Sequence, residues 1–424
     1  MTTVDRMKPA VGSWTEQYPE LGTGLISYND CTSSEFHELE RRAVFQRVWL
    51  MVGRVEQLPR NGSYFTKELA VANTSIIVVR DLAGDVRAFH NVCRHRGNKL
   101  VWQDFPREPT AGNCRQFTCK YHGWQYGLDG ACTFVQQEDE FFDLDKADFG
   151  LVPVHCDVWE GFVFVHLDEP RQPLREFLGP MLQSVEGYPF HVHTERYGYR
   201  VEVGSNWKLF FDAFQEYYHA PVLHANQTPA ISTEMQTAGF AGAYYELDGP
   251  HRLGATGGQR VTRGMSPDLL KPTERLTRSG LIGPWDGPDF SETAAGLNRG
   301  GFEKWTVSAF HVFPNTTILF RGAGWYLTYS YWPTAFNRHV FEGNLYFTPS
   351  RNARERVAHE MTRATHKEYA LQDCNTLEAT QMALESGVLA AFPLNDHEVL
   401  CRHLHQVVGE WVADYQREHA VVDG

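Results

Sequence analysis

The sequence contains two similar runs, Cys93-Arg94-His95-Arg96-Gly97 and Cys119-Lys120-Tyr121-His122-Gly123-Trp124, separated by residues 98–118. Each run holds one cysteine and one histidine, in the spacings C-x-H and C-x-x-H, and a glycine follows each pair. Glycine adopts backbone conformations that other residues avoid, so Gly97 and Gly123 suit tight turns. The two runs therefore predict two loops that each present a thiolate and an imidazole to a metal.

This ligand set fits a Rieske-type [2Fe–2S] cluster, in which two cysteines bind one iron and two histidines bind the other. Imidazole is neutral, so such a cluster is less negative than one held by four thiolates and has a higher reduction potential. Zinc is the first alternative, although its structural sites usually use C-x2-4-C and H-x3-5-H pairs, which these runs lack. A disulfide between Cys93 and Cys119 is the second alternative.

The composition is that of a globular protein, with 42% hydrophobic and 21% charged residues. A chain of 424 residues is too long for one ordinary core, so we expect two domains. The net charge of −13 argues against a nucleic-acid-binding surface. The sequence has no long apolar run and no apolar region at its N-terminus, so we expect a cytoplasmic protein without membrane spans. Its eight cysteines fit a reducing compartment.

The N-terminal part contains one segment with helical periodicity, residues 32–49. Phe36 and Val44 fall on its apolar face. Thr32 is the expected N-cap, and Glu35 completes a capping box with it. We therefore expect a helix that leads into the first domain.

Between Trp49 and Leu167 the pattern changes to short β-branched runs, which indicate a small antiparallel β domain carrying the two metal loops. Two prolines, Pro170 and Pro173, then interrupt any sheet and place the domain boundary near Asp168. The expected strands are 75–80 and 86–92, joined by a hairpin at 81–85, and 161–167. The expected organisation is an N-terminal segment and helix at 1–45 that pack on the second domain, the β domain at 46–168 and the second domain at 169–424.

The second domain combines strand-like and helix-like segments, so the predicted fold class is α+β. Successive runs linked by short turns predict an antiparallel sheet flanked by helices. The expected strands are 197–203, 305–313, 316–321, 325–332 and 339–347, and the expected long helices are 353–386 and 396–417.

A second metal site is indicated within residues 206–224. A helix from Trp207 to His219 would place Glu216 and His219 on one face, and Pro221 would end it so that His224 turns back. Two histidines and a carboxylate with open positions form the facial triad of non-haem Fe(II) oxygenases. Alternatively, both are ordinary histidines of an aromatic-rich helix.

The residues quoted above resemble the ring-hydroxylating Rieske non-haem iron oxygenases, specifically their alpha subunit, the large terminal oxygenase subunit. The two cysteine–histidine runs are similar to its Rieske box, and Glu216-x-x-His219-Ala-Pro-x-x-His224 is similar to its mononuclear iron motif. The resemblance covers roughly residues 30–415 and implies a helix-grip, START-like catalytic domain. The interval between the runs is longer than usual in the family and holds Pro106, Pro109 and Cys114, which concerns a surface loop.

The resemblance also implies roles for individual residues. Glu216 matches the carboxylate that links the cluster of one subunit to the iron of its neighbour, and it replaces the aspartate of many members. A glutamate there also occurs in quaternary-ammonium-oxidising relatives, although that branch usually has Cys-Pro where this chain has Ala220-Pro221. Asp373 matches an Asp-x4-Glu-x2-Gln pattern; otherwise it is a solvated helix acid, and Glu378 is the second candidate. The implied ligands are Cys93, His95, Cys119 and His122 for the cluster, and His219, His224 and Asp373 for mononuclear Fe(II).

By this resemblance the chain is an oxidoreductase of the EC 1.14 class, the terminal oxygenase of a multicomponent system that uses O2. Electrons from NAD(P)H would arrive through a ferredoxin, a flavin reductase or both, because the chain has no dinucleotide-binding motif. The expected reaction is mono- or dioxygenation of a small apolar aromatic or alicyclic substrate, as in aromatic hydrocarbon catabolism. Oxidative N- or O-demethylation is the alternative, and a Rieske electron carrier without catalysis is a third. The family implies a homotrimer, with which a small beta subunit can associate.

Overall fold

The computed structural model describes residues 13–103, 110–226, 243–257, 271–280, 283–284, 286–303 and 305–420. They form the predicted α+β fold and divide into two compact units, one of residues 44–177 and one of residues 1–43 and 178–424. Pro106, Pro109 and the first twelve residues of the predicted N-terminal segment lie outside the described part. The domain limits expected from the sequence, 46–168 and 169–424, stay a prediction.

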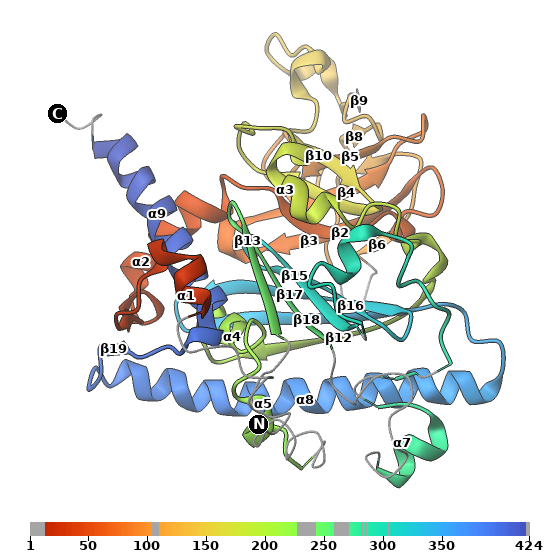
Figure 1. Ribbon diagram of the computed structural model, residues 1–424. Helices are drawn as coiled ribbons and strands as arrows, with labels where there is room; N and C mark the ends of the chain where they lie inside the picture. Colours follow the sequence, from red (N-terminus) through yellow and green to blue (C-terminus); the bar gives the residue numbers. More distant parts are fainter. Residues whose placement is uncertain are drawn as a thin grey trace, which may run out of the picture. The chain divides into compact units, whose positions relative to one another are not determined.

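The unit of residues 44–177 is built on antiparallel strands, as predicted (Figure 1). The hairpin of β4 and β5 is confirmed: Ile77 pairs with Phe89, and Asp81 accepts a hydrogen bond from the backbone of Asp85 in the turn. Its larger sheet has the order β2-β11-β10-β5-β4-β3-β6, with β2 Leu50–Arg54, β3 Ser63–Leu69, β4 Thr74–Arg80, β5 Val86–His90, β6 Ala111–Asn113, β10 Pro153–Trp159 and β11 Phe162–His166. A smaller sheet contains β7 Phe117–Thr118, β8 Gln125–Tyr126 and β9 Cys132–Phe134.

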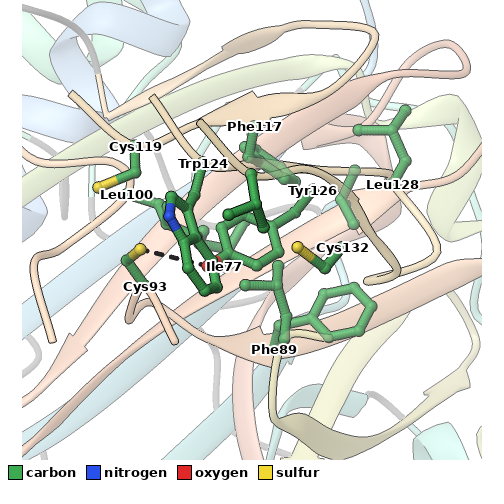
Figure 2. Packing of buried hydrophobic residues seen from close by; sticks show 13 residues of the cluster. Ile77, Phe89, Cys93, Leu100, Phe117, Cys119, Trp124, Tyr126, Leu128 and Cys132 are labelled. Atoms are coloured by element: carbon green, nitrogen blue, oxygen red, sulfur yellow. Dashed lines mark hydrogen bonds between the residues drawn. The ribbon is translucent and has the colours of Figure 1, made fainter. Parts of the chain in front are cut away.

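A buried apolar cluster joins the two sheets of this unit. It includes Ile77 and Phe89 from the larger sheet and Phe117 and Tyr126 from the smaller one. Figure 2 shows Cys93 and Cys119 next to Trp124 at one edge of this cluster. The cysteines of the two metal loops therefore rest on a packed core that holds their backbones in place.

The catalytic unit contains one antiparallel sheet of seven strands in the order β12-β18-β17-β16-β15-β14-β13. Five strands agree with the predicted segments to within a few residues: β12 Glu195–Val203, β15 Trp305–Val312, β16 Thr316–Arg321, β17 Trp325–Ala335 and β18 Arg338–Phe347. Two were missed, β13 Ala243–Asp248 and β14 His251–Gly257. These two form the edge hairpin of the sheet, and β13 is only partly buried, which leaves a weak hydrophobic pattern.

Helices cover this sheet, and the long helix α8, Ala353–Glu385, runs beside it (Figure 1). Its buried face carries several polar residues, among them His359, His366 and Asp373, at positions where a structural helix would have apolar side chains. The other helices with described bounds are α1 Ser13–Gln17, α2 Ser34–Glu40, α3 Leu174–Gln183, α4 Trp207–Asp212, α5 Ala220–Leu223, α7 Pro272–Thr277 and α9 Val399–Ala420, and β1 Ile26–Ser27 pairs with β19 Ala391–Phe392. None of the helices in the described ranges is long and apolar enough to cross a membrane.

The N-terminal helix begins one residue later than predicted. Ser33, not Thr32, is the N-cap, because its hydroxyl accepts the hydrogen bond from the backbone of Phe36 at 3.1 Å. Thr32 instead donates its hydroxyl proton to the carbonyl of Asn29 in the preceding turn. After Glu40 the helix widens into a π-helical turn that ends at Phe45.

Candidate metal centres

The two cysteine–histidine loops have nearly the same backbone geometry. In the first, the backbone N–H of Cys93 donates to the carbonyl of Asn98 at 2.8 Å, and that of Gly97 donates to Cys93 at 3.0 Å. The second repeats both bonds, from Cys119 to Trp124 and from Gly123 to Cys119, at 2.8 and 2.9 Å. Gly97 and Gly123 have φ angles of 74° and 73°, which side chains disfavour. The glycines are therefore required by the turns, as the sequence predicts.

The loops bring their side chains together. The rings of His95 and His122 lie 4.6 Å apart between centroids, and His95 stacks on Trp124 at 5.0 Å. Cys93 and Cys119 are buried and free, so the disulfide alternative is wrong. His95 Nδ1 is buried and has no hydrogen-bond partner in the described ranges. Two free thiols beside two imidazoles fit a [2Fe–2S] cluster held by these four residues.

Tyr126 is a neighbour of the cysteines that sequence reasoning missed. Its hydroxyl lies 3.2 Å from the sulfur of Cys93 and accepts a hydrogen bond from the backbone N–H of Arg94 at 3.0 Å. The Tyr126 proton is therefore free to point at the sulfur. Hydrogen bonds to cysteine sulfur are one of the means by which proteins set the potential of iron–sulfur clusters.

The second candidate centre rests on a segment that folds differently from the prediction. Helix α4 ends at Asp212, so the helix predicted to run from Trp207 to His219 is wrong. The Glu216 carboxylate accepts hydrogen bonds from the backbone N–H groups of Tyr218 and His219, which competes with continuing the helix. Pro221 lies in the first turn of the short helix α5, where its missing N–H costs nothing, rather than ending a helix.

The structure nevertheless brings His219, His224 and Asp373 together. Asp373 Oδ1 lies 3.8 Å from His219 Nε2 and 3.4 Å from His224 Nε2. His224 and Asp373 are buried, and the His219 side chain is 25% exposed. Asp373 comes from α8, far along the chain, and is not a solvated helix acid.

Each histidine of this group is oriented by a side-chain oxygen on its other nitrogen. His219 Nδ1 donates to Glu216 Oε1 at 2.5 Å, and His224 Nδ1 donates to the amide oxygen of Gln372 at 2.7 Å. In the neutral form of the rings both Nε2 atoms then carry lone pairs toward Asp373 Oδ1, which is buried and has no hydrogen-bond partner among the described residues. Three acceptors that converge without a proton repel one another, so the set fits a cation such as Fe(II).

The contact with Glu216 also changes the pKa of His219. Burial alone lowers the pKa of His219, but the hydrogen bond and charge of Glu216 outweigh it and leave that pKa raised.

Gln372 was not recognised in the sequence, and its position directly before Asp373 is the only signal that could have pointed to it. Glu378, the second candidate ligand, instead accepts a hydrogen bond from the backbone of Gly204 at 2.8 Å.

Aromatic side chains from α4 and the residues after it pack against the sheet. Phe210 and Phe211 are fully buried, and Phe211 stacks on Tyr331 at 4.4 Å. Phe214 contacts Tyr329 with a ring separation of 5.2 Å. Beside the proposed ligands themselves, the ring of Tyr369 lies 4.4 Å from that of His224.

Family models match both parts of the chain. Residues 48–152 match the Rieske [2Fe-2S] domain, and residues 190–414, more than half of the chain, match the ring hydroxylating alpha subunit (catalytic domain). The chain therefore belongs to the Rieske ring-hydroxylating oxygenase alpha subunits. A [2Fe–2S] cluster and a mononuclear non-haem iron are the cofactors of these two domains, as predicted.

Similar curated proteins are oxygenase components for methylammonium compounds. The chain is 30% identical over 187 residues to the glycine betaine monooxygenase oxygenase subunit of Pseudomonas aeruginosa, across 44% of this chain and 42% of that protein. It is 35% identical over 195 residues to the chloroplastic choline monooxygenase of Spinacia oleracea, across 44% and 42%. The matched regions thus span less than half of these relatives.

Solved structures share the fold. The quaternary ammonium Rieske monooxygenase CntA in complex with L-carnitine superimposes with a TM-score of 0.70 at 19% identity, covering 93% of this chain and 97% of that one. Naphthalene 1,2-dioxygenase with bound indole gives a TM-score of 0.69 at 21% identity, covering 93% and 94%. At this identity the likeness concerns the fold alone.

Proposed function

We propose that this protein is the terminal oxygenase of a Rieske system that oxidises an N-methyl group of a small quaternary ammonium compound. The main support is the group of His219, His224 and Asp373, whose inward-facing atoms are all acceptors and fit Fe(II). The relatives named for glycine betaine and choline favour a quaternary ammonium substrate over an apolar aromatic molecule. An aromatic hydrocarbon as substrate has no comparable support.

The aromatic surroundings suit a methylammonium group. Tyrosine faces attract cations through their ring quadrupole, and quaternary ammonium groups are bound by aromatic side chains in many proteins. Tyr369 lies against His224, and Tyr329 lies against Phe214 of the segment after α4. A methylammonium group near His219 and His224 would thus meet aromatic faces rather than water.

The reaction inserts one oxygen atom of O2 into a methyl C–H bond, while two electrons and two protons reduce the other atom to water. The hydroxymethylammonium product then loses formaldehyde and a proton to leave the demethylated amine. Iron, when bound, supplies the site at which O2 is activated. Glu216 and Gln372 hold the two imidazoles so that their Nε2 lone pairs stay directed inward. His219, His224 and Asp373 are the proposed iron ligands.

The electrons require a partner, because the chain itself has no nicotinamide- or flavin-binding motif. We include a reductase or ferredoxin partner and a homotrimer in the proposal. Arg96 and Lys120 are exposed on the two cysteine–histidine loops and make a basic surface for an acidic partner. Lys99 contributes less, because it pairs with Glu68 at 2.8 Å. Lys120→Glu should slow reduction of the cluster and weaken its dependence on salt, and unchanged stopped-flow rates across ionic strength would place the partner elsewhere.

The decisive experiment is product analysis on the iron-loaded protein with a surrogate reductase. A panel of trimethylammonium compounds, apolar aromatics and aryl methyl ethers should give formaldehyde only from the first group. Iron analysis should give about three irons per chain, as expected for a cluster plus one mononuclear site. Dihydroxylated aromatics without formaldehyde would favour ring dioxygenation instead, and about two irons per chain would favour an electron carrier.

A further inference from the structure

Arg321, the last residue of β16, has an unusual environment for an arginine. Its Nε is buried and has no hydrogen-bond partner among the described residues. It also forms no ion pair there, and its guanidinium lies over the ring of Trp325 at 5.9 Å. Arg321 is only partly buried, but burying its Nε without a hydrogen-bond acceptor is unfavourable, so this environment suits the binding of an anion.

The neighbours of Arg321 supply a second donor and no negative charge. Trp325 is fully buried on the adjacent strand, and its indole N–H also has no partner within the described part of the chain. His366 packs against Trp325 with a ring separation of 5.1 Å. Its Nδ1 donates to the carbonyl of Thr362, and burial together with the charge of Arg321 lowers its pKa to about 3. His366 is therefore neutral.

Tyrosines connect this cation to the proposed iron ligands. The guanidinium of Arg321 lies within electrostatic range of Tyr329, Tyr217 and Tyr369. Tyr329 is in turn within range of Asp373, and the ring of Tyr369 lies against that of His224. The cation and the iron site are therefore neighbours separated by aromatic side chains.

The spacing of residues on α8 gives the approximate separation between His366, near Arg321, and the proposed ligand Asp373. His366, Tyr369 and Asp373 are buried on the same face of the helix, three and seven residues apart. Seven residues correspond to about 10 Å along a helix axis. A small molecule with a carboxylate at one end and a methylammonium group at the other fits within this length.

We propose that Arg321 binds the carboxylate of the substrate, which is a small zwitterion whose methylammonium end lies among the tyrosines beside His219, His224 and Asp373. This rests on the proposed function and narrows it, because a substrate with an alcohol or an ester in place of the carboxylate would leave Arg321 unpaired. Arg321 is a specificity residue and takes no part in the oxidation itself.

The test compares substrates that differ only at the acid end. Trimethylammonio acids with two to four carbons in the acid chain and their methyl esters are given to the iron-loaded protein. 5,5-Dimethylhexanoate is added as an isostere of the four-carbon acid that keeps the carboxylate but lacks the ammonium charge. Dissociation constants are measured by calorimetry, and formaldehyde is measured with a surrogate reductase. The variants are Arg321→Met, Arg321→Lys and, as a matched control, Arg338→Met, which removes an exposed arginine of β18.

Arg321→Met should weaken binding of the preferred acid and of its isostere by about 100-fold, because the charge pair with the carboxylate is lost, while the ester changes less than about 3-fold. Arg321→Lys should restore part of the loss, and Arg338→Met should change nothing. Equal losses for acid and ester, no loss, or no binding of any acid to the unmodified protein would overturn the proposal. If the acids bind through Arg321 but yield no formaldehyde, N-methyl oxidation fails and carboxylate recognition stands. If Arg321→Met demethylates the acid as well as the unmodified protein does, N-methyl oxidation stands and carboxylate recognition by Arg321 fails.

Discussion

The catalytic unit contains two groups of residues that could hold a metal ion by their types and spacing, and they differ in where the protons are. In one, the Nε2 atoms of His219 and His224 lie 3.8 and 3.4 Å from Asp373 Oδ1, which makes no hydrogen bond within the described part of the chain. In the other, formed by Asp30, Cys31 and His405, both ring nitrogens of His405 have carboxylate partners. Nδ1 lies 3.1 Å from Asp30, and Nε2 lies 3.0 Å from Asp212.

The difference decides which group can bind a metal. Burial lowers the pKa of His405, but Asp212 and Asp30 outweigh it and raise that pKa to about 10, so the ring is an imidazolium with no lone pair. Lys208, which is paired with Asp30 and Glu40, adds a second cation. Residue types alone do not distinguish these groups. Their hydrogen bonds do, because carboxylates bind both ring nitrogens of His405, whereas Asp373 Oδ1 forms no hydrogen bond with His219 or His224.

The largest expected effect comes from removing one imidazole from the proposed iron site. His224→Ala should lose the mononuclear iron and all product formation, because one of three protein ligands is gone, while the absorption of the cluster stays. Iron analysis and visible spectra measure both. The control is His405→Gln, which should keep its iron. Iron loss in His405→Gln but not in His224→Ala would mean that the group around His405, and not that around His224, binds the iron.

The second prediction concerns stability and pH. His405→Gln should lower the free energy of unfolding by about 3 kcal/mol near pH 6.5, since a buried ion network loses its central cation. A histidine pKa raised from about 6.5 to about 10 stabilises fully below the lower value and loses that effect as pH rises through the higher one. Chemical unfolding of both proteins between pH 6.5 and pH 10 should therefore show a narrowing difference. A constant difference would contradict the raised pKa.

The third prediction tests the carboxylate behind His219. Glu216→Gln keeps the shape but removes the charge at 2.5 Å from Nδ1, so product formation should fall by about 10- to 100-fold while iron and cluster remain. Single-turnover product yield and iron content separate these effects. If the variant loses iron as His224→Ala does, Glu216 is itself a ligand. If it turns over normally, its linking role between metal centres is wrong.

The smallest effect is expected from replacing Gln372, whose amide oxygen accepts the hydrogen bond of His224. Gln372→Leu removes the neutral amide oxygen at 2.7 Å from His224 Nδ1, and His224 should then bind iron about 10-fold less tightly. Titration of the iron-free protein with Fe(II) under anaerobic conditions measures this affinity. Gln372→Glu, which restores an acceptor, serves as the rescue variant. Equal affinity in all three proteins would show that packing against Tyr369 alone orients the ring.

Local sequence was sufficient to predict a structure where the interactions that form it lie within one turn of the chain. The loops after Cys93 and Cys119 are closed by glycines four residues later, and the same short-range bonds shape both. Strands such as β16 and β17 were recognised because alternating β-branched and aromatic residues fit a sheet buried on both faces. The helix predicted after Trp207 failed because a side chain, Glu216, replaced the helical bonds of the backbone.

The sequence by itself determined the two iron centres as chemical expectations, since ligand type and spacing restrict the metals that a loop or helix can hold. Only the tertiary structure decided that Asp373 and not Glu378 faces the histidines and that Gln372 supports His224. The same holds for Arg321, which has no counter-charge among the residues that the structure describes. These are contacts between residues more than a hundred positions apart or between neighbouring strands. Short-range patterns cannot specify them, because they depend on which faces of α8 and the sheet meet.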